Sequence, residues 1–81
     1  MDLMEILRRL TAAYGPSGKE DEVAQLIQEL AAPYCDELRR DTLGNLICHR
    51  RGSGPRVMVS AHMDTIALVA THVDEQGHIR V

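Results

Sequence analysis

The spacing of the hydrophobic residues changes at Pro33, and this change constrains the fold more than any other feature of the sequence. Before Pro33, apolar side chains recur every three or four residues, which places them on one face of a helix. After Pro33, short apolar runs alternate with turn residues, the pattern of β-strands. The order of the two patterns predicts an α/β fold in which two N-terminal helices pack on a mixed β-sheet.

Two amphipathic helices are predicted before Pro33. The first ends at Gly15-Pro16-Ser17-Gly18, because proline lacks an N–H and glycine tolerates a positive φ. Ser17 and Glu20 have the spacing of a capping box, so we expect them to begin the second helix. The apolar positions are Leu3, Ile6, Leu7, Leu10 and Tyr14 in the first helix and Val23, Ala24, Ile27, Leu30, Ala31 and Tyr34 in the second.

Several short strands are predicted after Pro33. The first two should form a hairpin around Gly44-Asn45, and the last two should be joined by a turn at residues 75–77. Residues 57–59 are continuously apolar, as is typical of a central strand covered on both faces. The expected strands are residues 37–41, 46–50, 57–59, 67–73 and 78–81.

Composition and charge exclude several classes of function. The net charge of the 81 residues is −3, so nucleic acid is not an expected partner, because phosphate contacts need a concentrated cationic face. No apolar run has the length of a membrane span, and the N-terminus carries acids where a signal peptide is apolar, so we expect a cytoplasmic protein without a membrane partner. Cys35 and Cys48 lack the spacing of a zinc or redox motif and are interpreted as small buried hydrophobic residues.

His62 and Asp64 follow the apolar run of residues 57–59. Residues two apart on an extended backbone point to the same side, so both side chains should project from the end of a strand. In α/β sheets that end opens into the crevice where ligands bind. Imidazole is a suitable ligand for zinc and cobalt, and a carboxylate that accepts from the other ring nitrogen fixes the tautomer. His62 is therefore the candidate metal ligand, and Asp64 is its acidic partner.

The same histidine–aspartate spacing also has a simpler interpretation. It occurs by chance in a chain with four histidines and twelve acidic residues, so spacing alone leaves a surface role open. His72 and Asp74 repeat the spacing beside a turn, where polar groups at a strand end reach solvent. His49 and His78 are expected to be surface residues.

Four segments of the chain together resemble one family. They read YGPSGKEDEV (14–23), DTLGNLI (41–47), GPRVMVSAHMDTI (54–66) and VATHVDEQGHIRV (69–81). In this order they closely resemble the N-terminal part of the glutamyl-aminopeptidase-like metallopeptidases, cytosolic enzymes known for tetrahedral assemblies. Thr65 and Ala67 stand where that family usually has Glu and Gly, which indicates a divergent subfamily.

The resemblance implies both a fold and a reaction. Residues 1–74 would be the N-terminal part of a zinc-exopeptidase-like catalytic domain, and residues 75–81 would begin an inserted β-rich dimerisation domain. His62 would bind one ion of a two-metal site that holds zinc or cobalt, and Asp64 would be its catalytic partner. The implied reaction removes N-terminal residues from peptides with a metal-activated water, in a homo-oligomer built from dimers.

One histidine and one carboxylate are fewer than the three protein ligands of a catalytic zinc. By the resemblance, the missing ligands and the general base lie beyond the inserted domain, so we expect an N-terminal portion of a longer enzyme that is inactive alone. One alternative is a short non-catalytic chain that docks on or caps a full-length relative by strand addition. Another is a related two-metal acyl-amino-acid hydrolase or carboxypeptidase.

Overall fold

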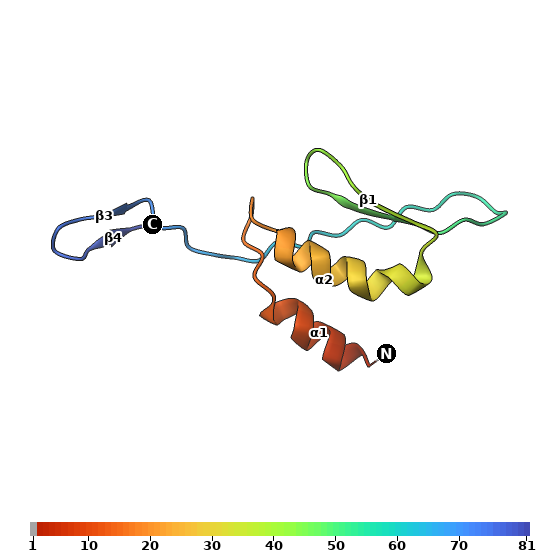
Figure 1. Ribbon diagram of the computed structural model, residues 1–81, viewed down its shortest axis with the longest axis horizontal. Helices are drawn as coiled ribbons and strands as arrows, with labels where there is room; N and C mark the ends of the chain where they lie inside the picture. Colours follow the sequence, from red (N-terminus) through yellow and green to blue (C-terminus); the bar gives the residue numbers. More distant parts are fainter. Residues whose placement is uncertain (1) are drawn as a thin grey trace.

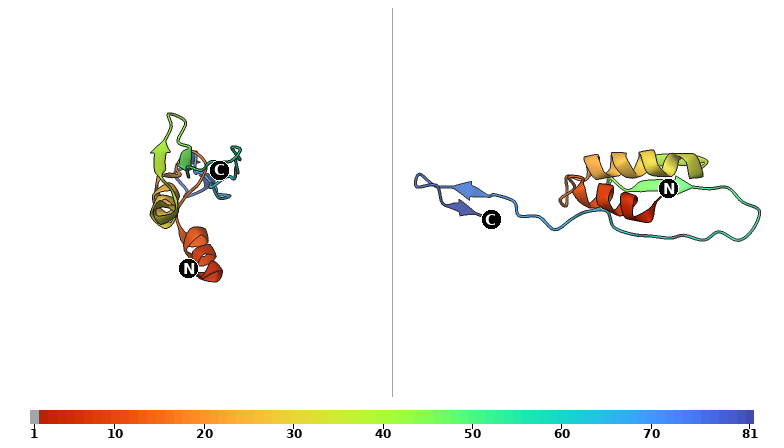
Figure 2. Two further views of the ribbon diagram at one scale, coloured as in Figure 1. Left: turned by 90° about the vertical axis from the view of Figure 1, so that its right-hand side faces the viewer. Right: turned by 90° about the horizontal axis from the view of Figure 1, so that it is seen from below.

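The structure of residues 2–81 is a computed structural model with two helices and two separate β-hairpins. The helices α1 and α2 lie side by side, and the first hairpin lies on the other side of α2 (Figure 1). A long extended segment leaves this hairpin, turns back along the helices and leads to the second hairpin at the far end of the molecule (Figure 2). The α/β class expected from the sequence is confirmed.

The first helix, α1, spans Leu3–Ala12. Asp2 caps it, because its carboxylate accepts a hydrogen bond from the N–H of Met4 at 3.1 Å. Glu5 lies in the first turn and Arg9 in the last, where their charges complement the helix dipole. Helical structure ends before Gly15-Pro16, as the sequence predicts.

The second helix, α2, spans Asp21–Ala31, and a single 3-10 turn, η1, follows at Ala32–Tyr34. The predicted capping box is wrong. Lys19 donates its N–H to the carbonyl of Pro16 at 2.8 Å, and Gly18 has a φ of 85°, so residues 16–19 form a turn of their own. The Glu20 carboxylate accepts from the N–H of Gly18 at 2.6 Å, which occupies the group that would reach back to Ser17.

The first hairpin pairs β1 (Glu37–Arg40) with β2 (Leu46–His49) in antiparallel register. Its turn matches the prediction, because Gly44 has a φ of 89° that favours glycine. Asp41 closes the turn: its Oδ1 accepts from the N–H groups of Leu43 and Asn45 at 3.0 and 2.9 Å. Its Oδ2 accepts from the Asn45 side-chain amide at 2.8 Å.

The predicted central strand at residues 57–59 is absent. Val57, Met58 and Val59 are extended but unpaired in the described chain, and their exposed fractions are 84%, 89% and 91%. A central strand needs a neighbour on each side, whereas β1 and β2 pair only with each other. The mixed sheet is therefore replaced by two antiparallel pairs.

The second hairpin pairs β3 (His72–Val73) with β4 (Ile79–Arg80). The predicted strand at 67–73 is thus reduced to its last part, while the predicted turn is confirmed, with a φ of 84° at Gly77. Asp74 organises this turn as Asp41 organises the first, since its Oδ1 accepts from the N–H groups of Gln76 and His78.

The hydrophobic core is small. Within residues 2–81, only Val23 and Ala24 are buried apolar residues, with exposed fractions of 3% and 0%. The accessible surface is 7202 Å², whereas a compact protein of this mass exposes about 4,900 Å². The radius of gyration is 16.9 Å, against about 12 Å for a compact chain of this length. Most apolar side chains are therefore uncovered. No helix within residues 2–81 combines the length and the apolar character needed to cross a membrane.

Candidate metal centre

The side chains of His62 and Asp64 contact each other as the sequence predicts. Nδ1 of His62 lies 3.0 Å from Oδ1 of Asp64, within hydrogen-bond distance. The imidazole is 86% exposed and the carboxylate 40% exposed, so the pair faces solvent. The strand expected to carry the pair is not formed; an extended backbone alone places the two side chains on one side.

The contact defines which atom of His62 could bind a cation. In the tautomer that donates Nδ1–H to Asp64, the other nitrogen, Nε2, keeps its lone pair. A carboxylate that holds the ring in this way also makes the imidazole a more basic ligand. The chemistry of the pair thus fits one ligand position of a zinc or cobalt site.

The described residues do not complete such a site. Within residues 2–81, no group of three or more His, Cys, Asp or Glu side chains lies close enough to hold a metal ion. A catalytic zinc normally has three protein ligands. His62 is therefore a candidate for a single ligand position, and its role as a metal ligand remains a prediction.

A backbone contact anchors the chain directly after the pair. The N–H of Thr65 donates to the carbonyl of Gly15 at 2.8 Å, and Pro16 and Thr65 form an isolated parallel bridge. Sequence analysis missed this contact, because Gly15 and Pro16 were interpreted only as helix-breaking residues. The loop between α1 and α2 is thereby placed beside the candidate pair (Figure 1).

The other histidines have surface roles. The second histidine–aspartate motif does not pair as its spacing implies: Asp74 contacts His78, with 3.1 Å between Oδ2 and Nδ1, while His72 lies in β3 opposite Arg80. His49 lies 4.0 Å from Glu37 across the first hairpin and is half exposed. The sequence spacing gave no signal for the Asp74–His78 contact.

The cysteines are less buried than expected. Cys35 is half-buried and Cys48 is exposed, so the interpretation of both as buried hydrophobic residues is wrong. Partial desolvation and a hydrogen bond with the Cys35 thiol still raise the pKa of Cys48 above its usual value, which favours the unreactive thiol at neutral pH.

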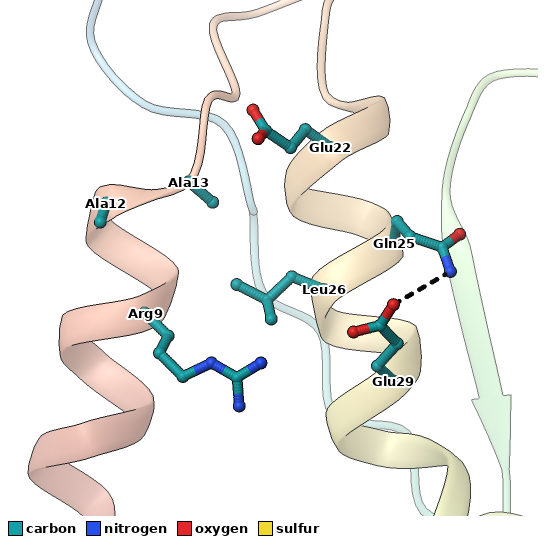
Figure 3. Close-up of a pocket in the computed structure, with 7 residues that line it drawn as sticks. All are labelled: Arg9, Ala12, Ala13, Glu22, Gln25, Leu26 and Glu29. Carbon is teal, nitrogen blue, oxygen red and sulfur yellow. Dashed lines mark hydrogen bonds between the residues drawn. The ribbon is translucent and has the colours of Figure 1, made fainter.

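The cleft between the two helices lies apart from the candidate pair. It has a volume of about 510 Å³, and Figure 3 shows Leu26 of α2 and Arg9 of α1 pointing into it. The remaining lining residues are Ala12, Ala13, Glu22, Gln25 and Glu29. Because none belongs to the segment of His62 and Asp64, the cleft is not part of the candidate metal centre.

Comparison with known proteins gives consistent matches. Residues 44–81, which include His62 and Asp64, match the family model of the M42 glutamyl aminopeptidases. A protein of Acetivibrio thermocellus named as an aminopeptidase is 40% identical over 79 residues, which are 98% of this chain and 24% of the relative. The lysyl aminopeptidase of Pyrococcus furiosus is 40% identical over 78 residues, 95% of this chain and 22% of the relative.

More distant matches extend to other hydrolases. FrvX of Escherichia coli, also named as an aminopeptidase, is 35% identical over 77 residues, 95% of this chain and 22% of the relative. A Pyrococcus furiosus protein named as a LysW-lysine/LysW-ornithine hydrolase is 38% identical over 63 residues, 78% of this chain and 19% of the relative.

The matched proteins define a class, since their names are those of peptidases and related hydrolases. Within that class, the chain is similar to the M42 glutamyl aminopeptidases, a family of metallopeptidases. The chain spans about a quarter of the length of the curated relatives it matches.

Proposed function

We propose that this chain is the N-terminal portion of a metal-dependent aminopeptidase that removes N-terminal residues from peptides. The observation that carries the proposal is the His62–Asp64 contact, which lies inside the segment that matches the M42 family. The aminopeptidase names of the relatives support the choice of reaction.

In the proposed site, His62 binds one of two divalent ions through Nε2, and Asp64 holds the proton on Nδ1 and orients the ring. Two zinc or cobalt ions would supply Lewis-acid polarisation and an activated water. The remaining ligands and the general base would come from outside residues 2–81.

The proposal includes an organisation for the complete protein. Residues 1–74 would belong to the catalytic domain and residues 75–81 to the start of an inserted dimerisation domain; the β3–β4 hairpin crosses that boundary. The protein would act in the cytoplasm on peptide substrates, as a homo-oligomer built from dimers. The uncovered apolar side chains are consistent with further protein surface packing against this segment.

A second candidate function is hydrolysis of a different amide by the same metal-bound site, such as that of an acyl-amino acid or a carboxypeptidase substrate. The similarity to a LysW-lysine/LysW-ornithine hydrolase supports this candidate. That protein is 38% identical to this chain, which is close to the identity of the aminopeptidases. Thr65 and Ala67 lie one and three residues after Asp64 and differ from the residues usual in the family that the sequence resembles.

Hydrolysis assays on the full native protein test the proposal. We expect release of the N-terminal residue from unblocked peptides, loss of that activity after treatment with a chelator, and recovery on addition of zinc or cobalt. Cleavage of acylated amino acids but not of unblocked peptides would select the second candidate. Activity that survives complete metal removal would contradict both.

A further inference from the structure

The loop between the helices approaches the candidate pair closely enough to fix its position. The carbonyl of Gly15 accepts the N–H of Thr65 at 2.8 Å, and Pro16 pairs with Thr65 in a parallel bridge. Thr65 directly follows Asp64, so these contacts hold the backbone at the C-terminal side of the pair. Figures 1 and 2 both show the loop crossing this segment.

Gly15 permits this approach because a side chain there has no room. A Cβ at Gly15 would lie 2.7 Å from Cγ1 of Val23 and 3.1 Å from its Cβ, and 3.8 Å from the carbonyl oxygen of Met63. Val23 cannot move aside freely, since it is one of the two buried apolar residues of the described chain. The requirement for glycine is therefore steric and does not come from a positive φ.

The first turn of α2 fixes the same loop from the other side. The carboxylate of Glu22 accepts the N–H of Tyr14 at 2.9 Å. The loop is thus attached to α2 by Glu22, rests on α2 through Gly15 and Val23, and is attached to the segment of Asp64 through Thr65. This chain of contacts links the buried face of α2 to the His62–Asp64 pair.

We propose that Gly15 is a positioning residue for the His62–Asp64 pair, a role that rests on the proposed metallopeptidase function. Its missing side chain lets the loop lie on Val23, and its carbonyl then sets the place of Thr65 and of the preceding Asp64. A side chain at Gly15 displaces this carbonyl and with it the carboxylate that orients His62. Displacements of about 1 Å are enough to reduce catalysis about 100-fold.

The test uses Gly15→Ala in the full native protein. We expect amide exchange at Thr65 to accelerate at least about tenfold, because its hydrogen bond to Gly15 is weakened. Cobalt(II) affinity, read from visible absorption, should fall about 10-fold or more. The value of kcat should fall more than KM rises, while the helical circular dichroism stays unchanged.

Two further variants separate positioning from general damage. Gly52→Ala is the matched control, because a Cβ at Gly52 has no neighbour within 4 Å, and it should leave every measurement unchanged. The losses caused by Gly15→Ala should be smaller when it is introduced into the Val23→Ala variant than when it is introduced into the wild type. Recovery is partial because Cβ of residue 23 remains 3.1 Å away.

The outcomes are distinct. The proposal is overturned if Gly15→Ala resembles Gly52→Ala in both Thr65 exchange and cobalt affinity. It is also overturned if Gly15→Ala reduces the helical circular dichroism and the added Val23→Ala substitution does not restore it. A wild-type protein without cobalt binding or hydrolysis would instead refute the proposed function. In that case Thr65 exchange alone decides whether Gly15 holds the segment.

Discussion

At the scale of single residues, two histidine–aspartate contacts of nearly equal length have different surroundings. His62 Nδ1 lies 3.0 Å from Asp64, and His78 Nδ1 lies 3.1 Å from Asp74. Asp74 also accepts two backbone N–H groups and so closes a turn. A histidine–aspartate contact alone therefore does not define a metal site. Substitution of the residues in each of the two pairs can separate metal binding from turn formation.

His62→Ala in the full native protein should abolish hydrolysis and weaken binding at one metal position, because it removes the candidate metal ligand. His78→Ala is the matched control, since it removes an equivalent exposed imidazole and should change activity little. His72→Ala should also have little effect. Steady-state kinetics and metal content measure both properties, and equal losses at positions 62 and 72 would show that the wrong motif was assigned.

Asp64→Asn should reduce metal affinity or the rate of hydrolysis by about 10–100-fold, the usual range for a residue that orients a ligating histidine. The amide keeps the shape of the carboxylate but removes the charge that stabilises the imidazole. Calorimetric titration with zinc gives the affinity, and Asp74→Asn is the control. Affinity unchanged by Asp64→Asn would contradict the orienting role.

The turn aspartates should make the hairpins sensitive to acid. Hydrogen bonds from Asn45 lower the pKa of Asp41, and the backbone N–H of His78 lowers that of Asp74, below the ordinary value of 3.8. A pKa lowered by folding means that the stabilisation is complete above pH 3.8 and is lost as the pH falls further. Amide chemical shifts of Leu43 and Gln76 during acid titration should therefore change below pH 3.8, and a midpoint above that value would contradict the assignment.

At the scale of elements, the hairpin β1–β2 depends on a glycine conformation. Gly44 has a φ of 89°, and an L-residue in the left-handed region costs about 1–2 kcal/mol. Gly44→Ala should lower the local free energy of opening of β1 and β2 by about this amount, as measured by amide exchange. Gly54→Ala, where a Cβ meets no atom within 4 Å, should leave exchange unchanged, and equal effects at the two positions would refute the explanation.

The elements that the sequence predicts well are those stabilised locally. The amphipathic spacing of α1 and α2 and the glycine turns at Gly44 and Gly77 need only neighbours within a few residues. Residues 57–59 have an equally clear strand pattern but form no strand, because a central strand needs partners on both sides. The capping box at Ser17 failed for a local reason, since residues 16–19 form a competing turn.

At the scale of the whole molecule, uncovered apolar surface dominates. Large side chains such as Val59 and Ile66 are almost fully exposed, and the molecule extends over 63 × 30 × 16 Å. Exposed apolar surface of this extent usually marks contact with further protein. Val23 and Ala24 lie near the start of α2, and the loop of Gly15 packs on Val23, which places the small core beside the candidate pair.

The 81 residues expressed alone should therefore bind a hydrophobic dye and unfold without a cooperative transition, because two buried apolar residues provide little cooperative stability. Dye fluorescence and a thermal scan by circular dichroism measure this. Size-exclusion chromatography tests the alternative of a docking or capping chain. A well-behaved monomer with a sharp melting transition would contradict the expected instability and remove the reason to invoke a docking partner.

The sequence by itself determined the two helices, both glycine turns and the contact between His62 and Asp64, because each depends on residues near one another in the chain. The Asp74–His78 contact is also local, because the two residues are four apart in the predicted turn, but the histidine–aspartate spacing pointed to His72 instead. Only the tertiary structure showed that Gly15 holds Thr65 and that the apolar run at 57–59 stays uncovered. Both depend on which distant segments meet, and spacing along the chain does not encode such contacts.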